Sequence, residues 1–221
     1  MPMHTLLITT HPSEAPLAAP GKCGRHYTMF VSVQQEGEQM APQPWRTRAS
    51  RDIYRNTWVR LREDIAELPD GRTTIYSVLT PGIGQCVGVL PFLPDGRVVM
   101  IRQYRYVYGE GHRWEMPTGG MHEGETPEEA AQRELQEEIG YRAGRFEWIS
   151  SYYTSKSVVE ETAHLFLGFD LTPSSLPPDE TEFLEIEAMP FEQVLDMVLR
   201  SDIRDSMTVT AVLHAARRLG V

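Results

Sequence analysis

The sequence predicts an α+β protein or an α/β/α sandwich. Strand-like segments occur in pairs joined by turn signals, a helix with clear start and stop residues lies mid-chain, and two helical stretches close the chain. A chain of 221 residues with 41% hydrophobic residues is long enough to bury the core of one such domain. No internal repeat is visible.

The first 45 residues or so differ from the rest of the chain in composition. They are rich in Pro, Gly, Ala and Gln with little periodicity, so we expect a poorly ordered tail over residues 1–45. His4, His11 and His26 lie in this tail at spacings that match no metal motif.

The strand-like segments follow from Arg51 onward. TWVRLREDIAEL and TTIYSVLT are joined by the turn PDGR, and GQCVGVLPFL and RVVMIRQYRY flank a second PDG turn. Further along, RFEWISSYY, TAHLFLGFDL and EFLEIEAM extend the strand pattern, the last after the Pro-rich loop TPSSLPPDET. Helices are expected in PFEQVLDMVLRS and SMTVTAVLHAARRL, at the end of the chain.

The stretch TPEEAAQRELQEEIG predicts a helix from about residue 127 to 138. Thr126 suits the N-cap, Pro127 the first helical position, and Glu129 completes a capping box. Gly140 is a natural stop. The buried face should consist of the residues that recur every four positions: Ala131, Leu135 and Ile139.

This helix crowds carboxylates on one side. Glu134 and Glu138 are four residues apart and Glu137 is three from Glu134. Such like-charge pairs cost roughly 0.2–0.5 kcal/mol each when exposed, and more in a cleft. Arg133 can reach some of these groups, but one guanidinium cannot neutralise the set. Mg²⁺, which takes oxygen ligands, can do so; the alternative is an acidic helix face turned to solvent.

Composition restricts the possible functions. A net charge of -10 argues against a nonspecific nucleic-acid binder, which needs a basic face. Cys23 and Cys86 form no CxxC motif, so a zinc site or a disulfide framework is not expected. No apolar run is long enough to span a membrane, and LLITT lacks the flanks of a signal peptide. We therefore expect a cytoplasmic protein.

The loop WEMPTGGMHEGE joins a proline, glycines and glutamates just before the helix, which lets the backbone approach a ligand closely. Gly119, five residues, Glu125, seven residues, and then RELQEEIGY resemble the signature of the Nudix hydrolases. One position departs from it: Tyr141 stands where the family usually has an aliphatic residue.

The resemblance covers about residues 50 to 215 and is to the ADP-ribose and nucleoside-diphosphate-sugar pyrophosphatase branch. It implies the Nudix α/β/α sandwich preceded by a small antiparallel β-element that builds a homodimer. The implied organisation is a tail at 1–45, a dimerising β-element at 46–80 and a Nudix hydrolase domain at 81–221.

The activity implied is Mg²⁺-dependent hydrolysis of the diphosphate of ADP-ribose or a related nucleoside diphosphate sugar, with Mn²⁺ able to substitute. GDP-mannose stays an alternative substrate, because Lys156 stands where ADP-ribose-specific members usually carry proline. A noncatalytic nucleotide-binding regulator would have lost box carboxylates, which are all present here. A nucleoside-triphosphate pyrophosphatase would lack the N-terminal β-element.

The resemblance also assigns the metal site. Glu134 and Glu138 are the principal ligands, Glu137 supports them, and the carbonyl of Thr118 completes the set. Arg133 orients a carboxylate of the Nudix signature, or else forms a purely structural ion pair.

The general base and the substrate-binding residues are expected outside the Nudix signature. The general base is expected from a loop, with three candidates that could also be plain surface carboxylates: Glu161, Glu180 and Glu182. Trp58 and Tyr76 match aromatics that sandwich the base, although core packing would also explain them. Arg105 matches a phosphate-contacting arginine, and Arg102 and Gln103 are weaker candidates.

Overall fold

The computed structural model describes residues 43–109 and 111–221. The predicted tail lies almost wholly outside the described residues, and so do its three histidines and Cys23. From Pro44 to Val221 the chain forms one unit. No helix in the described part of the chain is both long and apolar enough to cross a membrane.

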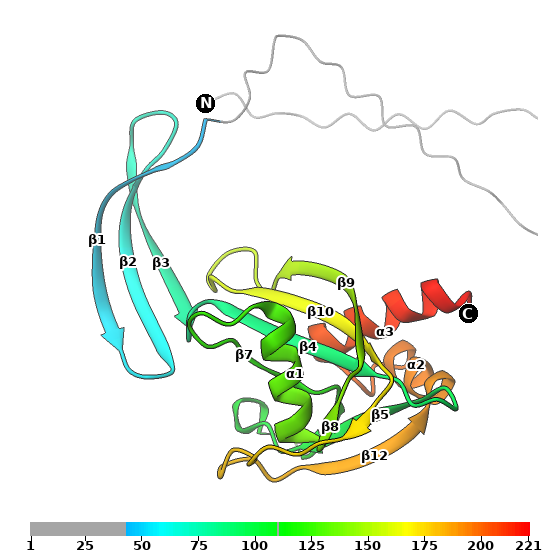
Figure 1. Ribbon diagram of the computed structural model, residues 1–221. Coiled ribbons are helices and arrows are strands. Elements are labelled where there is room, and N and C mark those ends of the chain that lie inside the picture. The colour runs from blue at the N-terminus through cyan, green and yellow to red at the C-terminus, as the bar shows by residue number, and fades with distance from the viewer. Residues whose placement is uncertain (1–42, 110) are drawn as a thin grey trace, which may run out of the picture. The chain divides into compact units, whose positions relative to one another are not determined.

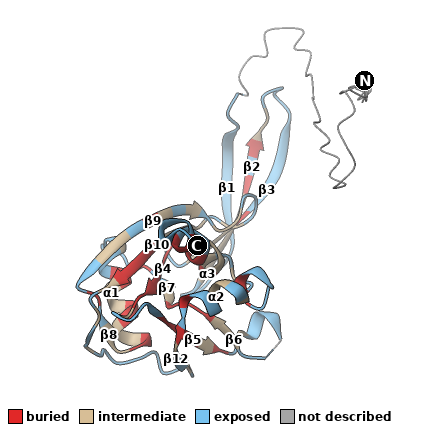
Figure 2. Ribbon diagram, turned by 90° about the vertical axis from the view of Figure 1, so that its right-hand side faces the viewer, coloured by how far each residue is buried: buried red, intermediate tan, exposed pale blue. Residues whose placement is uncertain are grey.

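The N-terminal sheet is an antiparallel meander of β1 (Arg46–Arg55), β2 (Val59–Glu67) and β3 (Thr73–Pro81), in that order. Every residue of β1 is exposed, and little of this sheet is buried (Figure 2). The first strand-like segment expected from the sequence, TWVRLREDIAEL, begins at Thr57 and therefore misses β1. RTRASR shows no apolar alternation, because neither face of the strand is buried within this chain.

Two sheets form the centre of the domain (Figure 1). One has the order β7-β4-β10-β9, with β10 parallel to β4, and the other has the order β12-β5-β6. A short pair, β8 and β11, lies beside them. The strands are β4 (Gln85–Pro91), β5 (Arg97–Gln103), β6 (Arg113–Glu115), β7 (Thr118–Gly120), β8 (Tyr141–Arg142), β9 (Arg145–Tyr153), β10 (Thr162–Phe169), β11 (Thr172–Pro173) and β12 (Glu185–Pro190).

Three helices cover these sheets from two sides: α1 (Pro127–Glu138), α2 (Phe191–Leu199) and α3 (Ser206–Leu219). One core cluster joins α1 to Val87 and Val89 of β4. A second cluster joins α2 and α3 to Leu90 and Leu165. Because successive strand residues point to opposite faces, the two clusters lie on opposite sides of the sheet. This is the α/β/α sandwich that the sequence predicts.

Helix α1 begins and ends as its sequence predicts. Thr126 and Glu129 form a reciprocal capping box, and Gly140 has a left-handed φ of 70° just beyond the helix. The predicted buried face is confirmed, since Ala131 and Leu135 are fully buried and Ile139 is 5% exposed. Tyr141 packs at the margin of the same core cluster.

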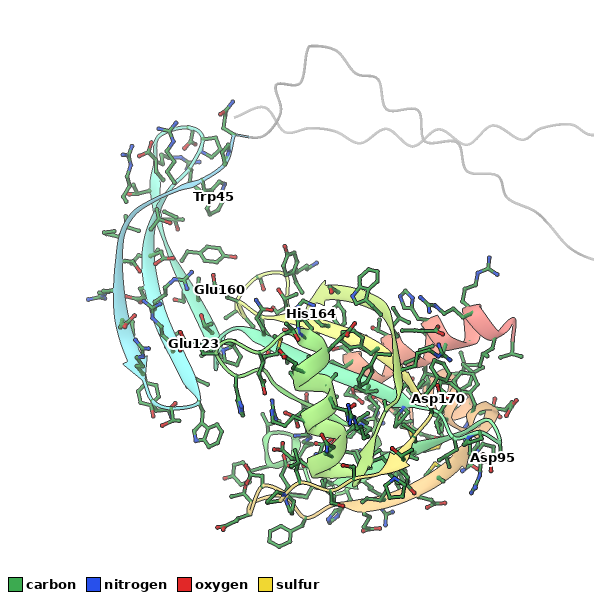
Figure 3. All side chains as sticks on the ribbon, viewed as in Figure 1. Trp45, Asp95, Glu123, Glu160, His164 and Asp170 are labelled. Carbon is green, nitrogen blue, oxygen red and sulfur yellow. The ribbon has the colours of Figure 1, made fainter. Side chains whose placement is uncertain are left out.

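The N-terminal sheet is tied to the segment between β9 and β10. The Leu79 amide donates to the Val158 carbonyl at 2.9 Å, and the Glu160 amide donates to the Leu79 carbonyl at 2.8 Å. Arg62 Nη1 donates to Glu160 Oε2 at 2.6 Å, and Glu160 is labelled in Figure 3. These bonds fix where β2 and β3 meet the rest of the unit.

Leu135→Ala should lower the free energy of unfolding by about 2–5 kcal/mol, because it leaves a cavity between α1 and β4. Leu213→Ala on α3 is the control: Leu213 is 44% exposed, and its loss should cost less than about 1 kcal/mol. Urea unfolding measures both. Equal losses for the two variants would contradict the assignment of α1 to the core.

Candidate active site

The backbone of β7 passes directly over a carboxylate of α1. A Cβ atom on Gly119 would lie 2.0 Å from the carboxyl carbon of Glu134, closer than real contacts allow. Gly119 also pairs with Val87 in the sheet, so the strand cannot move away freely. Glycine at this position lets the Glu134 carboxylate lie against the strand, and any larger residue would have to displace that carboxylate.

Glu138 is the most deeply buried carboxylate of the site, with 3% of its surface exposed. The Thr118 amide donates to its Oε2 at 3.0 Å, but its Oε1 has no hydrogen-bond partner among the described residues. Burial raises the pKa of Glu138 well above its ordinary value, and the charges of Glu134 and Glu182 add to this. A buried carboxylate oxygen of this kind is available to bind a cation or a water molecule.

The Arg133 guanidinium holds three carboxylates at once. Its Nη1 lies 2.5 Å from Glu134 Oε1 and 3.0 Å from Glu137 Oε2, and its Nε lies 2.8 Å from Glu125 Oε1. Its Nη2 also donates to the Gly120 carbonyl at 2.8 Å. The bond from Arg133 is the chief reason why the pKa of Glu125 falls to about 2. Arg133 therefore links the loop before α1 to the acidic side of the helix.

This donor set fits a divalent cation. Glu134, Glu137 and Glu138 offer carboxylate oxygens, which Mg²⁺ prefers, and one of these oxygens lacks a partner. Within the described residues, however, no three Asp, Glu, His or Cys side chains are gathered into a ready-made cage. Arg133 already occupies oxygens of Glu134 and Glu137, so these two side chains would have to turn toward the ion.

Glu182 is coupled electrostatically to the acidic side of α1. Its charge helps to raise the pKa values of Glu134 and Glu138. Burial also raises the pKa of Glu182, with Asp179 adding to the shift and Arg105 opposing it. A cavity of about 420 Å³ between α1 and the segment before β12 is lined by Glu182 together with Glu138.

The other two loop glutamates have different surroundings. Glu180 is exposed and does not line this cavity. Glu161 is half-buried beside Cys86, whose pKa is raised to about 12 by burial first and by the charge of Glu161 second. Glu182 is the candidate for the general base whose charge acts on the carboxylates of α1.

Three candidates for substrate binding lie in β5 or just after it, and their surroundings differ. Arg105 forms an ion pair with buried Glu115, in which Nη2 lies 3.0 Å from Oε1. Arg102 pairs with Glu185 and lies over the ring of Trp114. Gln103 is buried, and its Nε2 has no partner in the described part of the chain.

Sequence reasoning missed Glu115 as a member of the site. It is 6% exposed, and burial raises its pKa although Arg105 opposes the shift. Its charge in turn contributes to the raised pKa of Glu138. The available signal was a single carboxylate in the strand-like segment RWEMP, immediately before the box.

Trp58 and Tyr76 do not meet within one chain. Trp58 is 72% exposed, which excludes core packing in the described structure. Tyr76 donates its hydroxyl to the Ser157 carbonyl at 2.6 Å. The register pairs Asp64 with Tyr76, whereas Trp58 lies just before the Val59–Pro81 pair, on the order of 20 Å away at about 3.3 Å per residue. Both assignments remain predictions.

Comparison with known proteins identifies the architecture. The NUDIX domain model matches residues 83–208, more than half of the chain. The chain belongs to the Nudix family. The model of the nucleoside diphosphate sugar hydrolase N-terminal domain matches residues 45–79, which covers the meander almost completely.

Relatives of this Nudix hydrolase align over most of their length. The methanol dehydrogenase activator of Bacillus methanolicus and the ADP-ribose pyrophosphatase of Bacillus subtilis (strain 168) are each 32% identical over 172 residues, which cover 76% of this chain and 91% of theirs. A crystal structure titled ADP compounds hydrolase superposes with a TM-score of 0.74 at 24% identity, covering 82% of this chain and 97% of that one. The last comparison supports the fold.

Gly119→Ala should destabilise this Nudix hydrolase by about 1–3 kcal/mol, because the new methyl group overlaps Glu134 and must displace it. Gly120→Ala is a matched control one residue away, since a Cβ there meets nothing within 4 Å. Chemical denaturation and hydrolysis rates should both separate the two variants. Two variants that behaved alike would show that the close approach of β7 to α1 is not constrained.

Glu138→Gln should stabilise the protein in EDTA at neutral pH by about 1 kcal/mol or more, because it removes a buried carboxyl group whose ionisation is disfavoured by burial and whose Oε1 has no partner among the described residues. The pKa of Glu138 is raised by folding, so its favourable contribution is complete below the unfolded pKa and is lost as pH rises through the folded one. The gain of the variant should therefore vanish in acid. A gain that is absent at pH 7, or that persists unchanged in acid, would contradict this account.

Proposed function

We propose that this Nudix hydrolase cleaves the diphosphate of ADP-ribose and related nucleoside diphosphate sugars, releasing AMP and ribose 5-phosphate from ADP-ribose. The buried, partly unpartnered carboxylates of α1 carry the proposal, because a hydrolytic site for an anionic diphosphate needs a cation among them. The N-terminal domain match and the Bacillus subtilis relative favour this class of substrate.

Nudix hydrolases generally use divalent metal ions, and we propose Mg²⁺ here, with Mn²⁺ as a substitute. Glu134, Glu137, Glu138 and the Thr118 carbonyl would hold the ion. When bound, it would neutralise charge on the diphosphate and lower the pKa of a water molecule. The expected location in the cytoplasm stays a prediction.

Side chains of the protein would orient the carboxylates, accept a proton and bind the phosphate groups. Arg133 donates to one oxygen of each of Glu134 and Glu137, so it would orient these carboxylates as they turn toward the ion. Glu182, whose pKa burial raises, is our choice for the general base, since a base works best with a pKa near the working pH. Arg105 would contact the phosphate groups, which a guanidinium can bind with two N–H groups at once.

We also propose that the protein is a homodimer joined through residues 46–80. Trp58 and Tyr76 are too far apart in one chain to enclose a single base, but rings from two subunits could do so. The fully exposed β1 and the exposed apolar side chains Ile53 and Ile75 support this interface, since an open strand edge invites pairing. Light scattering should give twice the 25.1 kDa of the chain, and a monomer at micromolar concentration would contradict the proposal.

GDP-mannose is the second candidate substrate. Lys156 is exposed in the segment between β9 and β10, where the ADP-ribose-specific pattern has proline. Stacking alone does not separate adenine from guanine, because both bases present a π-face.

The test is hydrolysis of a panel of ADP-ribose, GDP-mannose, UDP-glucose, NADH and dGTP, with the released phosphomonoester detected after phosphatase treatment. ADP-ribose should give the highest kcat/KM, and EDTA should abolish the activity until Mg²⁺ or Mn²⁺ is added. A kcat/KM for GDP-mannose about tenfold above that for ADP-ribose would contradict the proposed substrate but not the proposed hydrolysis of a diphosphate. Full activity in EDTA would overturn the chemistry.

Trp58→Ala should raise KM for ADP-ribose more than it lowers kcat, because a stacked base lies far from the phosphorus that reacts and contributes uniform binding. Loss of one stacking ring is worth about 1–3 kcal/mol, or roughly 5- to 150-fold in KM. Trp148→Ala is the control, since Trp148 is also exposed but lies on β9. If neither variant changed KM, Trp58 would have no role in binding the base.

A further inference from the structure

The Arg105 guanidinium is held along one edge by a single buried carboxylate. Its Nε lies 3.0 Å from Glu115 Oε1 and 3.2 Å from Oε2, and its Nη2 lies 3.0 Å from Oε1. Glu115 itself is fixed in β6, where it pairs with Ile101 of β5. The position of Arg105 is therefore set by a rigid strand, although Arg105 belongs to the connection that follows β5.

This pairing leaves part of the guanidinium available. A guanidinium has five N–H donors, and Glu115 engages only the Nε and Nη2 edge. The N–H groups of Nη1 point away from that edge by the planar geometry of the group. The Arg105 side chain is 37% exposed, whereas that of Glu115 is 7% exposed, so the free edge is the one that a ligand can reach.

The Arg105–Glu115 pair adjoins the candidate active site through the chain, because Glu115 is three residues before Thr118, whose amide donates to Glu138 Oε2. The positive charge of Arg105 acts to lower the pKa values of Glu182 and Asp205. The negative charge of Glu115 acts to raise the pKa of Glu138. Arg105 thus stands near the place where the proposed function puts the diphosphate. An arginine side chain that moves freely loses conformational entropy each time it binds a ligand. A side chain that Glu115 already holds in place avoids most of this loss.

We propose that Glu115 is a positioning residue that holds Arg105 edge-on, so that the free N–H groups of Arg105 bind the diphosphate of the substrate beside Glu138. This rests on the proposed function, and it adds a residue that lies outside the Nudix box. Glu115 does not touch the substrate. It acts only through the guanidinium that it orients.

A purely structural ion pair makes different predictions. If Glu115 only filled the core, Glu115→Gln would lower stability but leave the kinetics of the folded enzyme unchanged. If it positions Arg105, the variant binds diphosphates more weakly even when fully folded, and its effect depends on the presence of Arg105. A double-mutant cycle between the two residues separates these cases.

The experiment compares wild type, Glu115→Gln, Arg105→Ala and the double variant, each as the full chain with Mg²⁺. Glu115→Gln should lower kcat/KM for ADP-ribose by about 10- to 100-fold, as expected for a lost charge-assisted contact. In the Arg105→Ala background the same change should alter kcat/KM by less than about twofold. Asp95→Asn is the control, because it breaks the exposed Asp95–Arg97 pair at the other end of β5 and should leave kcat/KM unchanged.

Binding of methylenediphosphonate, a diphosphate that cannot be hydrolysed, gives a second readout by calorimetry. Wild type should bind it more tightly than Glu115→Gln by a similar factor. If Glu115→Gln does not fold, Glu115→Asp, which keeps the charge but shortens its reach, takes its place in both measurements. Unchanged kinetics and binding in the folded variant, or additive effects in the cycle, would overturn the proposal.

The two proposals fail in different ways. If wild type binds methylenediphosphonate in a Glu115-dependent manner but hydrolyses no nucleotide sugar, the proposed function is wrong and the role of Glu115 stands. If wild type hydrolyses ADP-ribose and Glu115→Gln does so equally well, the role of Glu115 is wrong and the proposed function stands.

Discussion

The burial of like charges at the C-terminal half of α1 is the constraint on which the rest of this structure depends. Glu134 and Glu138 are buried together against β7, and burial raises both pKa values, with the charges of Glu137 and Glu182 adding to the shift at Glu134 and those of Glu134 and Glu182 at Glu138. Such an arrangement costs folding free energy unless a cation offsets it. Arg133 does this in part, and its contacts also tie the preceding loop to the helix.

Two glycines beside this cluster lie close to side chains that a Cβ atom would overlap. Gly119 lies against Glu134, and a Cβ on Gly88 of β4 would come 2.4 Å from the methyl group of Met116. The sheet therefore approaches α1 on one face and the Met116 side chain on the other at close range. Rigid packing of this kind suits a site that must hold oxygen atoms in fixed places.

Much of this could be predicted from the sequence because the signals are local. The capping box, the four-residue apolar spacing and the glutamate spacing all lie within α1, so its bounds and buried face could be derived directly. The role of Glu115 could not, because its partner Arg105 comes from another strand connection and strand pairing is not visible in the spacing. Strand β1 was not recognised as a strand for a related reason: a strand exposed on both faces carries no alternation.

The central claim is that the carboxylates of α1 are kept together in order to bind a divalent cation. Electron paramagnetic resonance of added Mn²⁺ tests it most directly, because bound Mn²⁺ loses its free-ion signal whatever the substrate turns out to be. The account predicts saturable binding by wild type that is lost when Glu134 and Glu138 are both replaced by glutamine. Equal Mn²⁺ binding by the folded double variant, or none by wild type with or without methylenediphosphonate, would contradict it.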